Sequence, residues 1–538
     1  MTKSLLYKSA FILGFSSLLS RLLGVVRDHL LAGTFGAQGE GAFNLDVYYA
    51  AFRIPDFIYA ILIMGAVSAA FVPVLTEVMH GKGKTLDEGG SLFVSNVLNV
   101  VLCAVILFGG IAFLFAPFIV RFLVPGFTGG DFPLTILVTR IMLVSPIFFG
   151  ISAVLQAAQN TFDKFFYIAI APIFYNIGII LGIYFFAQQY GVFAVAGGVI
   201  VGAFLNLLIQ IPGVLALKFR YRPFVCLKDP YLRKMIRLVI PRILGMSVMQ
   251  VNLIFDTLVG SLLATGSITI LNYAVNLNSL PMGMVGISFA IASFATLSSM
   301  AVDIEKAGKP TLEFRKKFAN HLGKIVVSIL YFVVPAAVGL FVLRFQIVDV
   351  ILGNGAFTDN DILLTGNTLA FFLIGLLGQS LIPVFARTFY AFKNTLTPVL
   401  ISVSAMILNI GLNFYFALSL ELGVYGIALA TSLTSLLNMV LLVIFLRSKF
   451  LSGMQIFDLR RVGAILFAGI IMGIAVYFMN IYLIAFAEVS SLNQILALCA
   501  SIVVGIIVFF CSILPFGLEE TNYLLKKLFL KNVLHLRI

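Results

Sequence analysis

Fourteen long apolar segments dominate the chain and restrict what it can fold into. Spanning a hydrocarbon core about 30 Å thick takes about 20 predominantly apolar helical residues. The segments lie near 8–33, 43–78, 91–121, 133–159, 165–187, 191–217, 235–264, 267–300, 321–345, 363–390, 396–419, 423–446, 462–484 and 491–515. With 61% hydrophobic and 11% charged residues, the chain lies far outside the range of soluble globular proteins. We therefore predict an all-α polytopic membrane protein with fourteen transmembrane helices.

The polar stretches between the segments are too short for a soluble domain. The longest, 218–237, 301–320 and the tail after Pro515, have only about twenty residues each. The first segment carries Arg21 and Arg27, and we expect it to be retained rather than cleaved as a signal peptide. The four cysteines have no metal-ligand spacing, so we predict neither disulfides nor a transition-metal site.

The sequence contains no signature of ATP-driven transport or of intramembrane hydrolysis. Neither GxxxxGK[ST] nor HExxH nor GxSxG occurs, and no loop is large enough for a nucleotide-binding domain. We therefore expect a protein that is not an enzyme and that needs no cofactor. Any work it performs would draw on an ion gradient or on the membrane potential.

Basic residues collect in loops on one side of the predicted membrane. The formal net charge is +13, but most Lys and Arg residues lie in the loops on the side of the N-terminus, and the opposite loops hold only Arg121 and Arg344. This positive-inside bias predicts that both termini are cytoplasmic. The charge thus indicates topology and attraction to anionic membrane lipids, not nucleic-acid binding. The tail 516–538 has the pattern of a basic interfacial helix.

Three pairs of matching stretches recur in the same order along the chain. "SRLLG" at 20–24 resembles "PRILG" at 241–245, and "FYNIGIILGIYF" at 174–185 resembles "ILNIGLNFYF" at 407–416. "GVFAVAGGVIVGAFLN" at 191–206 aligns with "GVYGIALATSLTSLLN" at 423–438. Six predicted spans separate the copies, which indicates a parallel internal repeat.

The repeat predicts two lobes of six helices and two additional C-terminal helices. We assign 1–217 to an N-lobe, 218–447 to a C-lobe, 448–515 to helices 13 and 14, and 516–538 to the cytoplasmic tail. Two lobes of this kind would enclose a central cavity suited to alternating access. The repeated Gly and Asn residues are most simply interpreted as sites of close helix packing.

Ionisable residues are concentrated in the first two predicted spans. An arginine at the bilayer centre costs about 2.5–3.5 kcal/mol on insertion scales, so such residues usually face a polar cavity. One interpretation is internal ion pairing, for example Arg21 with Asp46 and Arg53 with Asp28. The other is binding of an anionic phosphate group, which the guanidinium donor fork suits well. The candidate substrate-binding residues are Arg21, Arg27, Asp28, Asp46 and Arg53.

The predicted C-lobe offers a different set of polar side chains. Asp256 lies in the seventh span, Asn409 and Asn413 lie one helical turn apart in the eleventh, and Thr431 lies in the twelfth. Oxygen ligands from three helices can coordinate a hard cation, so these four residues form a candidate coupling-cation site for Na⁺ or H⁺. An interhelical hydrogen-bond network is the alternative.

Several motifs together resemble one known family. They are "SRLLGVVRD", "FRIPDF", "GAVSAAFVPVLTE", "NLIFDTLVG", "LPMGMVGISFA" and "FYAFKNTLTPV". They resemble the MurJ (MviN) lipid II flippases of the multidrug/oligosaccharidyl-lipid/polysaccharide exporter superfamily. The resemblance covers essentially the whole chain. It implies fourteen helices, a central cationic cavity, and a groove beside helices 13 and 14 for the lipid tail.

The resemblance also implies a substrate and a location. The expected activity is flipping of undecaprenyl-pyrophosphate-linked peptidoglycan precursor across the bacterial plasma membrane, in cell-wall biogenesis, with cell-wall synthesis proteins as candidate partners. Arg21, Arg27 and Asp28 match the first family motif, and Asp46 matches the family's helix 2 acid. Tyr59 and Asn276 stand where arginines are typical, and Met64 where glutamate is typical. Arg53 or Arg242 is a candidate replacement for the missing arginines.

Three functions remain open from the sequence. The leading one is a lipid II flippase whose cavity arginines bind the headgroup pyrophosphate. The second is a cation-coupled exporter of small molecules or of other polyprenyl-linked oligosaccharides. The third is a non-transporting membrane scaffold in which the embedded charges form structural ion pairs. Helices 13 and 14 favour the first over a small-molecule exporter, for which twelve helices suffice.

Overall fold

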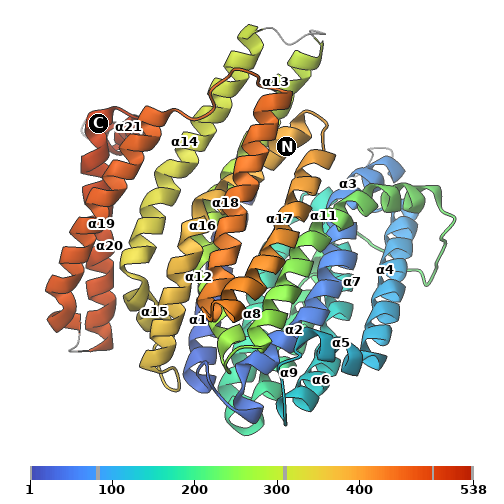
Figure 1. The fold of residues 1–538 in the computed structure, drawn as a ribbon. Helices are drawn as coiled ribbons and strands as arrows, with labels where there is room; N and C mark the ends of the chain where they lie inside the picture. The colour runs from blue at the N-terminus through green and yellow to red at the C-terminus, as the bar shows by residue number, and fades with distance from the viewer. Residues whose placement is uncertain (1–2, 80–84, 307–311, 488–489, 535–538) are drawn as a thin grey trace. The chain divides into compact units, whose positions relative to one another are not determined.

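The protein is all-helical in the part that the computed structural model describes, which is residues 3–79, 85–306, 312–487 and 490–534. Packing divides the chain into two compact units. The first comprises Met1–Thr269 with Ile351–Asp361, and the second comprises Ile270–Val350 with Ile362–Ile538. The helices follow one another along the chain without an intervening strand in these ranges (Figure 1). The protein is thus a polytopic all-α membrane protein, as predicted.

Eleven α-helices build the first unit. They are α1 (Lys3–Phe35), α2 (Leu45–Ile58), α3 (Gly65–Val78), α4 (Glu88–Leu114), α5 (Ala116–Leu123), α6 (Asp131–Met142), α7 (Ser145–Thr161), α8 (Phe165–Tyr190), α9 (Val192–Leu208), α10 (Ile211–Leu215) and α11 (Pro230–Ser261). A π-helical segment, η2 (Tyr59–Met64), joins α2 to α3, so that the predicted second span is one interrupted helix.

The second unit is built mainly from the remaining helices. They are α12 (Ser267–Pro281), α13 (Ser288–Lys306), α14 (Leu312–Val342), α15 (Arg344–Leu352), α16 (Asp359–Ala391), α17 (Leu396–Phe414), α18 (Val424–Lys449), α19 (Leu459–Ala487), α20 (Ser491–Ile513) and α21 (Glu519–Leu534). The predicted lobes are defined by the internal repeat of the sequence, whereas the two units are defined by helix packing. The units therefore do not test the lobe boundaries, which stay a prediction.

Eleven helices or helix pairs of the described residues are long and apolar enough to cross a membrane, or twelve if the bent pair Pro230–Ile240 and Gly245–Ser261 counts as one. Each of the fourteen predicted segments coincides with helical structure. The predicted segments 8–33 and 43–78, which correspond to α1 and to α2–η2–α3, are not among the eleven or twelve. The number fourteen therefore stays a prediction.

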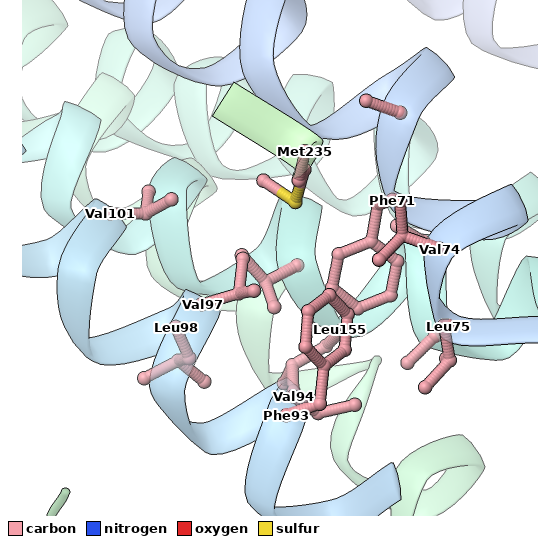
Figure 2. Packing of buried hydrophobic residues seen from close by; sticks show 14 of the residues in the cluster. Phe71, Val74, Leu75, Phe93, Val94, Val97, Leu98, Val101, Leu155 and Met235 are labelled. Atoms are coloured by element: carbon pink, nitrogen blue, oxygen red, sulfur yellow. The ribbon is translucent and has the colours of Figure 1, made fainter. Parts of the chain in front are cut away.

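A cluster of buried apolar side chains holds the first unit together (Figure 2). Phe71 of α3 packs against Phe93 of α4 with ring centroids 5.6 Å apart. Leu155 of α7 and Met235 of α11 complete the cluster. Because this contact joins α3, α4 and α7 to α11, the first unit contains the helix that the repeat assigns to the second lobe.

Side-chain caps mark the starts of several helices. The Asp87 carboxylate accepts a hydrogen bond of 2.6 Å from the backbone N–H of Gly90 at the start of α4. At the start of α11, Asp229 accepts one of 2.8 Å from the backbone N–H of Tyr231, with Pro230 at the first helical position. These caps satisfy backbone donors that have no partner within the helix.

The tail helix α21 is docked by its acidic first turn. Glu520 accepts a hydrogen bond of 2.6 Å from Ser328 of α14, and Thr521 donates one of 3.1 Å to the hydroxyl of Tyr331. Glu519 forms an ion pair of 2.9 Å with Lys324. The hydrogen bond that Lys324 donates lowers the pKa of the Glu519 carboxyl group. The predicted basic interfacial helix therefore has a fixed start on α14, and residues 535–538 lie outside the described part.

Helices α8 and α9, one copy of the repeat, approach so closely that glycine is required at their contact. A Cβ atom added to Gly178 would lie 2.4 Å from the Cα atom of Gly202, and one added to Gly202 would lie 2.4 Å from the carbonyl oxygen of Tyr175. Gly182 likewise faces Gly198. Of these glycines, Gly178 belongs to the repeated "NIG" pattern, and its interpretation as a helix-packing position is confirmed for this copy.

The matching glycine of the other copy has open space around it. Gly411 of α17 aligns with Gly178 in the repeat, but a Cβ atom added there would meet nothing within 4 Å. The shared "NIG" pattern thus serves close packing in one copy only.

This difference predicts opposite effects of the same substitution at the two aligned positions. We expect Gly178→Ala to lower the free energy of unfolding by about 1–3 kcal/mol, because the added methyl group must push two backbones apart. We expect Gly411→Ala to be neutral or to raise it by up to about 1 kcal/mol through helix propensity. Unfolding of the purified variants in mixed micelles measures both. Equal effects at the two positions would contradict the packing difference.

Candidate functional site

The guanidinium group of Arg27 is the centre of a polar site on α1. Its Nε and Nη2 atoms donate hydrogen bonds of 3.0 and 2.8 Å to the same oxygen, Oδ1 of Asp28. The side chains of Arg27 and Asp28 are 23% and 12% exposed, so both are largely shielded while the arginine stays accessible. A guanidinium group has five N–H donors, and these contacts leave it donors for a further acceptor.

Asn176 of α8 links this pair to the neighbouring helix. Its Oδ1 lies 3.5 Å from Nη1 of Arg27, and its Nδ2 donates a hydrogen bond of 3.2 Å to the carbonyl oxygen of Ser20 on α1. One buried amide thus contacts both the arginine and the backbone two turns before it. This arrangement fixes the guanidinium plane relative to α1.

Tyrosines surround the same arginine. Tyr48, Tyr49 and Tyr175 lie close enough to Arg27 to interact with it electrostatically. The ring of Tyr175 packs edge-on against Phe149 with centroids 5.2 Å apart, and Phe149 packs in turn against Tyr59 at 5.1 Å. Tyr59 stands where the family resemblance implies an arginine, and here it contributes aromatic packing instead of positive charge.

Arg21 lies on the exposed part of α1. Its side chain makes no hydrogen bond or ion pair with any residue in the described ranges, and it is solvent- or lipid-accessible. The predicted pairing of Arg21 with Asp46 is therefore wrong, because Asp46 contacts a turn elsewhere in the first unit. Arg21 is the more accessible of the two α1 arginines, and Arg27 is the one held in place.

Asp46 of α2 holds the turn between α11 and α12. Its Oδ2 accepts a hydrogen bond of 2.7 Å from the backbone N–H of Gly266, and its Oδ1 accepts two from Thr269, of 2.7 Å from the backbone N–H and 2.6 Å from the hydroxyl. Asp46 is only 2% exposed. Gly266 has φ +92°, and an added Cβ atom would lie 2.7 Å from the carbonyl oxygen of Ala37.

Arg53 of α2 belongs to a second charged group, shared with α11. Its Nε donates a hydrogen bond of 2.8 Å to the hydroxyl of Thr257. Asp56 and Asp256 both lie close enough to attract the Arg53 guanidinium. Asp256, a member of the predicted cation site, therefore lies beside Arg53, a candidate substrate-binding residue.

The other members of the predicted cation site lie together in the second unit. Nδ2 of Asn409 on α17 lies 3.4 and 3.2 Å from the hydroxyls of Thr431 and Thr434 on α18. Nδ2 of Asn413 donates a hydrogen bond of 3.2 Å to Oδ1 of Asn409. Asn409 and Asn413 are 3% and 0% exposed. Three neutral oxygens of the kind that hard cations accept thus gather here, already joined by hydrogen bonds.

Sequence reasoning missed Asn176 and Thr257 as site residues. Asn176 could have been found, because it is the Asn of the repeated "NIG" pattern and aligns with Asn409. Thr257 carried no signal, since a threonine in an apolar helix usually bonds its own backbone; here its hydroxyl also donates to the carbonyl oxygen of Leu253. The side chains of Arg242 and Met64 lie outside the described part.

Comparison with known proteins gives one consistent result. A sequence model of the family described as "Lipid II flippase MurJ" matches residues 31–520. A probable lipid II flippase MurJ of Vibrio cholerae is 35% identical over 447 residues, which cover 81% of this chain and 82% of the relative. A lipid II flippase MurJ of Burkholderia cenocepacia is 30% identical over 441 residues, covering 80% and 82%.

Solved structures show the same similarity. A lipid II flippase MurJ in an inward closed conformation matches with a TM-score of 0.75 and 26% identity, covering 93% of this chain and 98% of that one. An inward-facing MATE family multidrug transporter of the MOP superfamily matches with a TM-score of 0.59 at 12% identity, covering 79% and 94%, and so shares the fold. The resemblance seen in the sequence is thereby confirmed. The chain belongs to the MurJ lipid II flippase family and is a transporter, not an enzyme.

Proposed function

We propose that this protein moves lipid II across the bacterial plasma membrane by alternating access, with the headgroup pyrophosphate bound by Arg21 and Arg27. The observation that carries the proposal is the geometry of Arg27, an arginine within a membrane helix that is oriented by Asp28 and Asn176 and still accessible. A guanidinium held in one plane suits phosphate oxygens because it can donate two parallel hydrogen bonds.

The charges of the site favour an anionic ligand only when both arginines are counted. Arg27 is balanced by Asp28, with which it shares two hydrogen bonds. Arg21 has no partner among the described residues and supplies the net positive charge. A pyrophosphate that reaches Arg27 competes with Asp28 for the guanidinium donors. Opening of this pair by the ligand would couple headgroup binding to the position of α1 against α8.

Asp46 and Arg53 support the transport site indirectly in this proposal. The three hydrogen bonds that Asp46 accepts hold the turn between α11 and α12. Arg53 joins α2 to α11 through Thr257 and the neighbouring acids. Both would position helices that move during transport. We infer this positioning role for Asp46 and Arg53 in place of direct contact with the substrate.

The finer architecture belongs to the same proposal. We infer fourteen spans, in two repeated lobes with two additional helices. An even number of spans leaves both termini on one side of the membrane, and the positive-inside bias of the loops makes that side the cytoplasm. Undecaprenyl-pyrophosphate-linked precursor would be the substrate, and cell-wall synthesis proteins would be the partners that consume it.

Cation coupling is supported by the polar set of the second unit. Asn409, Asn413 and Thr431 present amide and hydroxyl oxygens at one place between α17 and α18, which suits Na⁺. In this proposal the cation gradient supplies the energy for the return of the empty carrier. The alternative is an interhelical hydrogen-bond network, and the response of the melting temperature to Na⁺ separates the two.

Arg27→Ala is expected to abolish transport, and Arg27→Lys is expected to lower headgroup binding by about tenfold or more, because lysine keeps the charge but loses the planar fork. Lipid II exposed on the outer leaflet is measured in cells depleted of their own flippase. Arg121→Ala, which removes an exposed arginine of α5, is the matched control and should leave transport unchanged. Full activity of Arg27→Ala at equal expression would overturn the role of Arg27, and absence of lipid II export by the wild type as well would favour a scaffold.

Asp46→Asn is expected to destabilise the protein rather than weaken headgroup binding. The neutral amide cannot accept from all three donors, and each buried donor left unpaired costs about 1–3 kcal/mol. The free energy of unfolding and the pyrophosphate affinity of the folded fraction are measured together. Glu40→Gln, the same charge change on an exposed side chain, is the control. A normal stability with a large loss of affinity would instead make Asp46 a direct ligand.

Addition of Na⁺ in place of a large organic cation is expected to raise the melting temperature, because a ligand that binds only the folded state stabilises it. Asn413→Ala should remove this rise, whereas Thr368→Val, at a threonine bonded to its own helix, should keep it. If the wild-type melting temperature does not respond to Na⁺, the set is a hydrogen-bond network only.

A further inference from the structure

A cavity of about 170 Å³, lined by both polar and apolar side chains, lies within the second unit, away from the residues discussed above. Four side chains with amide or carboxylate groups line it: Gln346 and Asp349 from α15, Asn480 from α19 and Gln494 from α20. Figure 1 shows α19 and α20 as a hairpin of adjacent helices. Polar side chains inside such a membrane hairpin are costly unless they have partners or a ligand.

The cavity is rich in acceptors. Nε2 of Gln494 donates a hydrogen bond of 3.3 Å to Oδ2 of Asp349. The buried Oε1 of Gln346 has no hydrogen-bond partner among the described residues. A buried acceptor without a partner is unusual in native proteins and calls for an explanation. No lysine or arginine is among the residues that line the cavity in the described ranges.

The position of the cavity matches the headgroup region of a bilayer. Helix α19 has 29 residues, which at 1.5 Å per residue gives about 44 Å, longer than a hydrocarbon core of about 30 Å. Gln494 is in the first turn of α20, and Asn480 lies about two turns before the end of α19. The cavity therefore lies near one end of the hairpin, where headgroups meet acyl chains.

Apolar side chains beside the cavity face outward. Tyr482 is 81% exposed and Leu492 is 65% exposed, and Ile495 is exposed as well. In a membrane these side chains contact lipid. A ligand that reaches the cavity would accordingly come from the lipid phase with its own acyl chains lying along the hairpin.

We propose that this cavity binds the primary ammonium group of an aminophospholipid such as phosphatidylethanolamine. An ammonium group has three N–H donors and one positive charge. Asp349 would supply the opposite charge, and the carbonyl oxygens of Gln346 and Asn480 would accept the remaining donors. The cavity has room for several water molecules, which is more than a bare cation needs, and its lack of basic side chains disfavours a phosphate. The proposed ligand differs from lipid II, although the family resemblance places the groove for the lipid II tail beside the same two helices.

The test compares lipids that differ only in the headgroup. Native mass spectrometry of the full-length protein measures retained phosphatidylethanolamine against phosphatidylcholine and phosphatidylglycerol with the same acyl chains. We expect at least about tenfold greater retention of phosphatidylethanolamine than of phosphatidylcholine, because the trimethylated headgroup keeps the charge but has no N–H donor. Equal retention of these two lipids would overturn the proposal.

Substitutions of cavity residues test whether phosphatidylethanolamine binds in the cavity. Asp349→Asn and, separately, Gln346→Leu are expected to reduce retention of phosphatidylethanolamine to the level of phosphatidylcholine. Asp359→Asn removes the same charge from an exposed side chain outside the cavity and should retain the lipid as the wild type does. Unchanged retention in both cavity variants would contradict the site.

A competition experiment distinguishes binding of a lipid from binding of a free amine or a metal ion. Ethanolamine, Na⁺ and Ca²⁺ are each added at the concentration of the lipid, and none should displace it if the acyl chains contribute to binding. Displacement by any of them would show that the cavity binds a small cation and not a lipid. Circular dichroism and melting temperature confirm that each variant is folded.

Discussion

The interaction on which the candidate site depends is the hydrogen-bonded pair of Arg27 and Asp28 with Asn176, which joins α1 to α8. A guanidinium in a helix that is predicted to cross the membrane needs partners, because hydrocarbon offers none. Asp28 supplies the charge from the same helix, and Asn176 supplies an oxygen from α8 while donating to the backbone of α1. The pair of helices is thereby fixed at the level of the arginine, and the remaining donors keep one orientation.

The internal repeat illustrates how one sequence pattern can serve two kinds of contact. In the first copy Gly178 and Gly202 let the backbones of α8 and α9 touch. In the second copy the position aligned with Gly202 is Thr434, whose hydroxyl contacts Asn409. At this position a hydrogen bond between side chains takes the place of the contact between two backbones. Asn176 and Asn409 occupy aligned positions, yet the former contacts an arginine and the latter two threonines.

The embedded charges divide into groups that no helical wheel predicts. Arg27, Asp46 and Arg53 all lie in the first two predicted spans, where the sequence analysis treats them as one set of candidate substrate-binding residues. In the structure Arg27 faces α8, Asp46 holds the turn before α12, and Arg53 bonds to α11. Arg27 also pairs with its neighbour Asp28, but the partners on other helices are more than 140 residues away in the chain, so spacing along α1 or α2 carries no information about them.

Hydropathy, positive-inside bias and the family motifs determined from sequence alone that this is an all-α membrane transporter of the lipid II flippase type, because the cost of burying polar groups in lipid leaves few alternatives. Helical spacing also made Asn409, Asn413 and Thr431 candidates for one cation site, and the structure brings these three together, whereas Asp256 of the same predicted site lies near Arg53. The partners of each charge were decided by tertiary structure. Hydrogen bonds such as those of Asp46 with Gly266 and Thr269 depend on which helix ends meet, and that is set by packing of the whole unit rather than by any local pattern.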